Sequence, residues 1–424
     1  MNLFCTQRFL PLFITQFLGA LNDNLFKNAL VMLVTFRIAA TTGYNAQTLV
    51  TLAAGLFILP FFLFSALAGQ IADKLNRDYL TRIIKTVEIV LMVVAASGFL
   101  MQNTWLLFAV LFGMGVHSTF FGPIKYALLP QQLAPTELLT GNAYIEAGTF
   151  LAILLGTIMG GLLILQDRGE AVVSAALITI AIAGYLSSRN IPAAPAMDPD
   201  LRIEWNIWRE TSRIISYSRQ DKQVFLCILG ISWFWLIGAT LLAEFAPFVK
   251  DILHAGPAIV TLFLTVFSVG IGIGSVVCNL LFRGQVRAFF VPLACVAISV
   301  FGIDLYFASR HFHGAGHGLT SFWAFIGMAS GLRVAFDLLM LAVSGGLYIV
   351  PLYTIMQRRS PSAHMARVVA ANNVMNALFM VASALLTLIL LAFKLTIPTI
   401  FVTVFIANLG FAAYIRKLQR MLCT

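Results

Sequence analysis

Charged residues are scarce in this sequence. Only 10% of its 424 residues are Asp, Glu, Lys or Arg, and 60% are hydrophobic. Soluble domains carry about 25% charged residues, so the composition excludes an ordinary soluble protein. The mean hydropathy of +0.92 indicates a polytopic membrane protein instead. The net charge of +10 predicts contact with anionic lipid headgroups and not with nucleic acid, because the bases flank apolar spans.

Residue sets that carry out catalysis are also lacking. No serine–histidine–acid set, metal cluster or phosphate-binding loop is present, so we expect no enzyme activity, no cofactor and no metal site. The five cysteines show no paired spacing, and Cys227, Cys278 and Cys295 lie in apolar runs, which is typical of core residues. The histidine-rich run 311–318 is better read as a solvated loop, because no carboxylate or cysteine completes a ligand set.

Long apolar runs dominate what is present. A span needs about 20 mainly apolar residues, and the sequence predicts twelve of them. They are Leu10–Phe36, Leu49–Ala72, Leu80–Leu100, Leu106–Leu129, Ala143–Leu165, Ala171–Leu186, Val224–Val249, Ile259–Phe282, Phe289–Phe307, Leu338–Ile355, Val368–Phe393 and Ile397–Ile415. Phe322–Phe336 is a shorter apolar stretch that we interpret as interfacial or re-entrant.

One polar segment divides the twelve predicted spans into two groups of six. Residues 188–222 contain three prolines and then a charged amphipathic piece, Leu201–Lys222, with Trp205 and Trp208. We interpret them as a cytoplasmic linker whose helix lies on the membrane surface. The predicted domains are therefore a six-helix bundle at 1–187, the linker at 188–222 and a second six-helix bundle at 223–424. Most of the 27 Lys and Arg residues, Lys85 among them, are assigned to loops and termini on one side of the membrane, which places both termini in the cytoplasm.

The first span is unusual because polar residues occupy its centre. Gln16, Asp23 and Lys27 fall on one helical face, and Asn24 lies beside them. A charge at mid-bilayer costs at least ~2.5–3.5 kcal/mol on insertion scales, so such residues face a protein interior or a wet cavity. Asp23 and Lys27 can also neutralise each other at i, i+4. The stripe is either a structural ion pair or the wall of a transport path.

The two halves echo each other in their polar positions. Pro123 in the fourth span and Pro351 in the tenth are followed by similar residues, and Asn142 and Glu146 of the fifth span correspond to Asn372 and Asn376 of the eleventh. A parallel six-helix repeat with substrate near the midplane is the design of major facilitator transporters.

The loop after the second span carries a motif. Gly69, Asp73, Lys74 and Arg77 match the major facilitator signature, in which a glycine, an alanine–aspartate–basic triplet and a further base follow one another. Glycine allows close helix packing, and the carboxylate can hold an arginine or a helix N-terminus. The resemblance implies a gate latch. The corresponding loop of the second half, 282–287, keeps bases but lacks the aspartate.

Three stretches sharpen the resemblance. Asn22–Asn24, Gly122–Tyr126 and Gly141–Ala147 look like the lysophospholipid transporter family, and also like the transporter portion of bacterial acyltransferase–acyl carrier protein synthetase fusions. The resemblance implies an all-helical major facilitator fold of two six-helix bundles in the bacterial inner membrane. It departs in the seventh span, where the family pattern can place an arginine and this chain has Leu241–Glu244.

This family moves lysophospholipid, especially lysophosphatidylethanolamine, from the outer to the inner leaflet for reacylation, so membrane lipids and a cytoplasmic acyltransferase are the candidate partners. Two other functions stay open. One is a proton-coupled exporter of amphipathic drugs or metabolites, and the other is a non-transporting scaffold for an acyltransferase. The chemistry suits a zwitterionic headgroup, because a lysine can attract phosphate, a carboxylate can meet an ammonium and amides can bond a glycerol hydroxyl. The candidate substrate-binding residues are Asp23, Asn24, Lys27, Lys125, Asn142, Glu146, Asn372 and Asn376.

Overall fold

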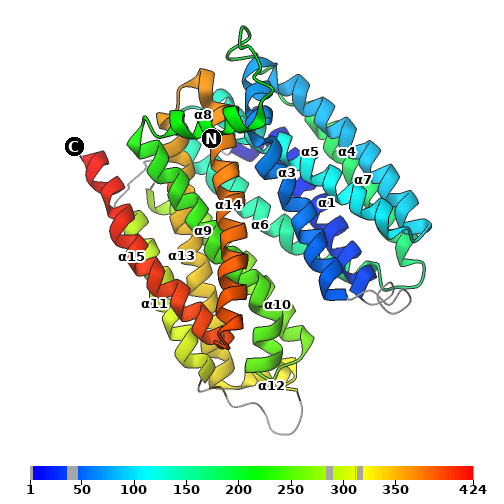
Figure 1. The fold of residues 1–424 in the computed structure, drawn as a ribbon, viewed down its shortest axis with the longest axis vertical. Coiled ribbons are helices and arrows are strands. Elements are labelled where there is room, and N and C mark those ends of the chain that lie inside the picture. The colour runs from blue at the N-terminus through cyan, green and yellow to red at the C-terminus, as the bar shows by residue number, and fades with distance from the viewer. Residues whose placement is uncertain (1–2, 36–45, 283–289, 311, 313–318, 424) are drawn as a thin grey trace. The chain divides into compact units, whose positions relative to one another are not determined.

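The computed structural model describes residues 3–35, 46–282, 290–310, 312 and 319–423 (Figure 1). The described chain is helical and contains no β-strand. Its α-helices are α1 (Leu10–Leu33), α3 (Ala46–Lys74), α4 (Arg77–Leu100), α5 (Thr104–Gln132), α6 (Leu138–Leu163), α7 (Gly169–Ser188), α8 (Ile207–Ser218), α9 (Lys222–Pro247), α10 (Pro257–Phe282), α11 (Phe290–Arg310), α12 (Phe322–Gly327), α13 (Ala329–Arg359), α14 (Met365–Ala392) and α15 (Ile397–Cys423). Two predictions, the loop at 283–287 and the histidine-rich run apart from Phe312, lie outside the described residues.

The all-helical membrane fold is confirmed. Eleven helices of the described chain are long and apolar enough to cross a membrane. The remaining predicted span is α1, whose 24 residues include the central polar group that lowers its hydropathy. The predicted interfacial segment Phe322–Phe336 proves to be two pieces, because α12 ends at Gly327 and α13 then runs unbroken from Ala329. The amphipathic linker helix is shorter than the predicted Leu201–Lys222.

The chain forms two compact units. Unit 1 comprises 1–141, 151–222 and 357–377, and unit 2 comprises 142–150, 223–356 and 378–424. The boundary after Lys222 coincides with the predicted end of the linker. Two stretches depart from the predicted division, since 142–150 of α6 joins unit 2 and 357–377, with the start of α14, joins unit 1.

Unit 1 has an apolar core between α1, α3, α4, α5 and α7. The helices α3 and α5 pack together, as do α4 and α7 (Figure 1). Phe26 of α1 meets Phe99 of α4 edge to face, with 5.7 Å between ring centroids. Gly156 of α6 permits a close approach to α1, because a Cβ there would lie 2.6 Å from the carbonyl oxygen of Leu21. This packing fixes the polar face of α1 against its neighbours.

Unit 2 combines aromatic packing with one buried amide. Phe245 of α9 contacts Phe263 and Phe267 of α10, with ring centroids 5.8 and 5.7 Å away. The helix α15 runs beside α11 (Figure 1). Between them, the buried Asn408 accepts a hydrogen bond from Trp233 Nε1 at 2.8 Å and donates one to the carbonyl oxygen of Cys295 at 2.7 Å. A satisfied polar group of this kind fixes the register of the helices it joins.

Candidate functional site: polar clusters and a latch

The polar residues of α1 take partners from within unit 1. Asp23 Oδ2 accepts a hydrogen bond of 2.6 Å from Ser118 Oγ of α5. Lys27 Nζ donates to Asn24 Oδ1 at 3.1 Å. Asp23 and Lys27 do not form the expected ion pair, because no salt bridge joins the two among the described residues. Asp23 Oδ1 is buried and has no hydrogen-bond partner in the described chain.

A fully buried charged cluster lies next to this face and was not predicted from the sequence. Glu88 of α4 accepts hydrogen bonds from Lys85 Nζ at 2.6 Å and from Asn22 Nδ2 at 2.9 Å. His117 Nε2 of α5 lies 3.3 Å from the same carboxylate. The prediction that Lys85 belongs to a cytoplasmic loop is wrong. Lys85 is two turns inside α4 and its side chain is 0% exposed.

Helix geometry explains how the sequence builds this cluster. Lys85 and Glu88 are at i, i+3 and therefore share one face of α4, and that face turns toward α1 and α5. The ammonium group of Lys85 also lies 5.0 Å from the ring centroid of Phe121. The i, i+3 spacing in an apolar run was the signal in the sequence. Asn22 and His117 come from other helices, so no local pattern connects them to it.

Lys125 lies farther along α5. Ser118 and Lys125 are seven residues apart, which puts them on the same helical face two turns apart. Because Asp23 contacts Ser118, it borders the face of α5 that carries Lys125. Lys125 Nζ lies 4.8 Å from the ring centroid of Tyr126. The predicted link between Lys125 and Glu146 joins two different units and stays a prediction.

Of the four polar positions that correspond between the two halves, three are buried. Asn142 is 0% exposed and its Nδ2 donates to Thr354 Oγ1 of α13 at 3.2 Å. Glu146 is 1% exposed in the same stretch of α6. Asn372 of α14 is 0% exposed, and neither amide atom has a hydrogen-bond partner in the described chain. Asn376 lies one turn further along and is partly exposed. An unsatisfied buried amide costs about 1–3 kcal/mol, so Asn372 is a candidate for a group that binds a ligand.

The signature loop forms a bridge within unit 1. Asp73, which is 0% exposed, accepts hydrogen bonds from Arg77 Nη2 at 2.8 Å and Arg367 Nε at 3.0 Å. The backbone N–H groups of Ala366 and Arg367, at the start of α14, donate to it at 3.0 and 3.2 Å. We call Asp73, Arg77, Ala366 and Arg367 the latch. The carboxylate thus holds both an arginine and a helix N-terminus, the two partners expected from the sequence.

Gly69 and the linker complete the surroundings of the latch. A Cβ at Gly69 would lie 2.7 Å from Cβ of Ala370 and 3.0 Å from the carbonyl oxygen of Ala366, so only glycine allows α3 and α14 to approach this closely. The linker contributes Asp198, whose Oδ2 accepts from Arg367 Nη2 at 2.8 Å. Lys74 is partly exposed beside the latch. The linker contact was not predicted, because nothing in the local sequence of 194–204 points to α14.

Unit 2 contains a further group of charged residues, which was not predicted as a site. Arg333 of α13 forms an ion pair with Asp304 of α11. Asp337, one turn beyond Arg333, is only 2% exposed and its Oδ2 has no hydrogen-bond partner in the described chain.

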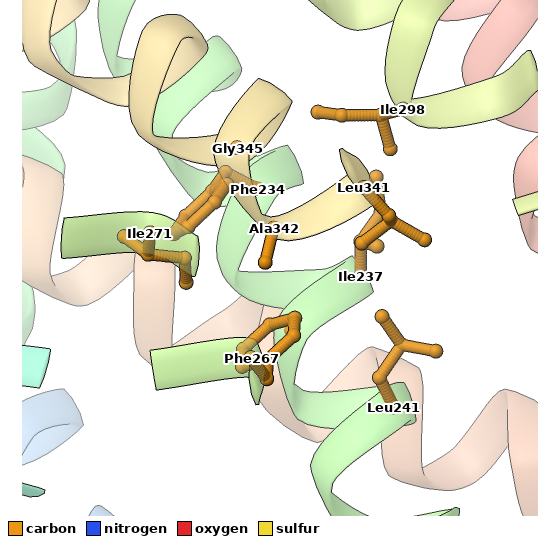
Figure 2. Close-up of a pocket in the computed structure, with 10 residues that line it drawn as sticks. Phe234, Ile237, Leu241, Phe267, Ile271, Ile298, Leu341, Ala342 and Gly345 are labelled. Carbon is orange, nitrogen blue, oxygen red and sulfur yellow. The ribbon is translucent and has the colours of Figure 1, made fainter. Parts of the chain in front are cut away.

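Unit 2 also has a small apolar cavity between α9, α10, α11 and α13. Figure 2 shows Phe234, Leu241 and Phe267 among the side chains around it. Its volume of about 10 Å³ is close to the least that one water molecule needs. Leu241, which opens the stretch Leu241–Glu244, lines this apolar wall.

Comparison with known proteins now gives these features a context. The sequence profile of the Major Facilitator Superfamily matches residues 12–384. Among curated proteins, the lysophospholipid transporter LplT of Serratia proteamaculans is 26% identical over 355 residues, covering 82% of this chain and 79% of that protein. LplT of Escherichia fergusonii is 25% identical over the same shares of the two chains.

Solved structures share the fold at low identity. The human organic anion transporter MFSD10 superposes with a TM-score of 0.73 and 13% identity, covering 95% of this chain and 99% of that one. A bacterial homologue of the iron transporter ferroportin gives a TM-score of 0.67 and 15% identity, covering 97% and 98%. The structural likeness supports the fold alone. The profile match covers most of the sequence, so this multi-pass membrane protein belongs to the Major Facilitator Superfamily of transporters.

Proposed function

We propose that this transporter moves lysophospholipids, with lysophosphatidylethanolamine as the principal substrate, from the outer to the inner leaflet of a bacterial inner membrane. The observation that carries the proposal is the similarity to lysophospholipid transporters along 82% of the chain. Transport proceeds by alternating access of the two six-helix halves, 1–187 and 223–424, with both termini in the cytoplasm. A cytoplasmic acyltransferase would then consume the delivered lipid.

Each candidate substrate-binding residue suits one part of the lipid headgroup. Asp23 of α1 presents an unpartnered carboxylate oxygen, which suits the ammonium of ethanolamine, and Glu146 is the alternative. Lys27 and Lys125 suit the phosphate, because a lysine ammonium is a compact point charge on a flexible stem. The remaining group consists of amides that can bond the glycerol hydroxyl, namely Asn24, Asn142, Asn372 and Asn376.

The latch supplies the gate in this proposal. Gly69, Asp73, Lys74 and Arg77 belong to the first half of the chain, while the start of α14 belongs to the second half. When the halves move apart at this end, the contacts of Asp73 to α14 must break. Its contact with Arg77, four residues away, can persist.

Uptake into proteoliposomes tests the transport proposal. Purified protein is reconstituted, and the entry of labelled lysophosphatidylethanolamine is compared with that of lysophosphatidylglycerol and a panel of amphipathic drugs. We expect the wild type to move the lysolipids in preference to the drugs. Asp23→Asn and Lys125→Gln should each reduce the rate at least tenfold, about 1.4 kcal/mol of lost stabilisation.

Exposed residues of the same types give matched controls. Asp167→Asn and Lys250→Gln change exposed charges at helix ends and should transport at the wild-type rate. Drug uptake without lysolipid uptake would favour the exporter. No uptake of either would favour the scaffold. Wild-type rates for both Asp23→Asn and Lys125→Gln would remove these residues from the site.

A further inference from the structure

The end of the linker and α8, residues 201–219, expose more positive than negative charge. Two tryptophans and four arginines are exposed between positions 201 and 219, with Trp205 71% and Trp208 64% exposed. The two carboxylates of this stretch are less exposed, since Glu210 is buried and the side chain of Glu204 is 30% exposed. The arginines are Arg202, Arg209, Arg213 and Arg219.

Helical periodicity places Glu210 and the arginines of α8 on different faces of the helix. Asn206 caps α8 by accepting a hydrogen bond of 3.1 Å from the N–H of Arg209, which fixes where the helix begins. From there Glu210, Ile214 and Ser218 follow one another on the buried face. Burial raises the pKa of Glu210, and Arg213, whose Nη1 lies 3.7 Å from Oε2, opposes this shift. Glu210 is thus turned inward, and the exposed face keeps an excess of positive charge.

Contacts with α3 set the position of this face along a membrane span. Gln70 of α3 accepts from the N–H of Glu204 at 2.8 Å and donates to its carbonyl oxygen at 3.1 Å. Trp208 meets Phe62 of α3 edge to face, with 5.8 Å between ring centroids. Gln70 and Phe62 are eight residues apart, which corresponds to about 12 Å along the helix. Trp208 therefore reaches from the end of the span toward its interior.

That position matches an interfacial helix. Amphipathic helices lie in the membrane plane with their apolar side about 5–10 Å deep, and tryptophans gather at the same level. Arginine presents a planar set of donors that fits a phosphate in bidentate geometry. Arg209 also lies 3.2 Å from Glu204, but its side chain is 77% exposed, so a phosphate can displace this pair.

We propose that the exposed Trp–Arg face of 201–219 binds the headgroups of anionic phospholipids in the leaflet beside the end of α3. The tryptophans rest at the boundary between headgroups and acyl chains, and the arginines hold the phosphates. This binding does not depend on which molecule the protein transports.

Tryptophan quenching by brominated lipids tests the proposal on the full chain. The protein is reconstituted in phosphatidylcholine vesicles that contain either brominated phosphatidylglycerol or brominated phosphatidylcholine. The signal of Trp205 and Trp208 is obtained by subtracting that of Trp205→Phe/Trp208→Phe. We expect phosphatidylglycerol to be preferred, and Arg209→Gln/Arg213→Gln to lose about fivefold of that preference for each base removed.

A control and a second measurement make the result decisive. Arg416→Gln/Lys417→Gln removes two exposed bases from α15, where no tryptophan accompanies them, and should keep the preference. Raising the salt concentration from 0.1 to about 1 M should weaken the preference of the wild type, since the Debye length falls from about 10 to 3 Å. Equal quenching by both lipids in the wild type overturns the proposal. So does a preference that survives Arg209→Gln/Arg213→Gln or high salt.

Discussion

Replacing Asp73 by asparagine should release the start of α14 without unfolding the turn between α3 and α4. The carboxylate makes three contacts with α14, two with backbone N–H groups and one with Arg367 Nε. Hydrogen bonds to charged groups contribute about 1.5–3 kcal/mol each. Asparagine keeps one acceptor oxygen and loses the charge, so we expect the latch to lose about 3 kcal/mol, near the lower bound for breaking a buried ion pair. That energy corresponds to a shift of about 100-fold in the equilibrium between closed and open latch.

Hydrogen exchange reads this equilibrium directly. The first N–H groups of a helix have no acceptor within it, and for Ala366 and Arg367 the acceptor is Asp73. Exchange of these two amides, measured by mass spectrometry on the 362–370 segment, should accelerate by about 100-fold in Asp73→Asn. Binding of lysophosphatidylethanolamine should change less than about threefold, because the latch is not part of the proposed substrate site and acts only on the balance of states.

Asp78 provides the matched control. It lies five residues further on, and its described partners are Arg82 Nη2 at 3.1 Å and the N–H of Ala194 at 3.1 Å. Asp78→Asn should leave the exchange of the 362–370 segment unchanged. Unaltered exchange in Asp73→Asn, together with tenfold weaker lipid binding, would refute the assignment of Asp73 to a latch.

Three further outcomes follow from single contacts. Lys85→Met should lower the free energy of unfolding by about 3–5 kcal/mol because it strands the buried Glu88, and Lys85→Met/Glu88→Gln should recover part of the loss in a double-mutant cycle. Desolvation raises the pKa of Glu137, but hydrogen bonds from Arg8 outweigh this effect and hold the pKa below its ordinary 4.5. The Arg8–Glu137 pair should therefore stabilise the protein above pH 4.5. This stabilisation should be lost as the pH falls below that value. A thermal melt series should show that loss in the wild type and not in Glu137→Gln. Gly69→Ala should open the latch, with faster exchange of the 362–370 segment, since its Cβ would lie 2.7 Å from a β-carbon of α14.

The sequence predicted the spans well because hydropathy is a local property. Each of the twelve predicted stretches corresponds to one long helix. The polar residues of α1 stood out for the same reason, since an apolar run isolates them. Boundaries were less certain where apolar residues continue past the span. The helix α13 begins at Ala329 and not near Leu338, because a run of helix-compatible residues precedes the predicted span.

Contacts between distant segments could not be predicted in the same way. Lys85 was counted as a loop residue because it follows a charged segment, yet its partner Glu88 lies one turn further into the membrane. Asn22 and His117 reach that pair from α1 and α5, and only packing decides such meetings. For Asp73 the motif predicted the kind of partner, but the sequence did not identify Arg367.

The contacts of the basic side chains in unit 1 also indicate which of them can bind a phosphate. Lys85, Arg77 and Arg367 each lie within 3.0 Å of a carboxylate, and their side chains are 0%, 1% and 8% exposed. None can turn to a substrate without giving up an ion pair with a buried carboxylate, which costs several kcal/mol. Lys27 hydrogen-bonds a neutral amide, and Lys125 lies over an aromatic ring. Because the hydrogen bond of Lys27 goes to a neutral amide, this lysine can turn to a phosphate without giving up an ion pair, which supports its place in the proposed site.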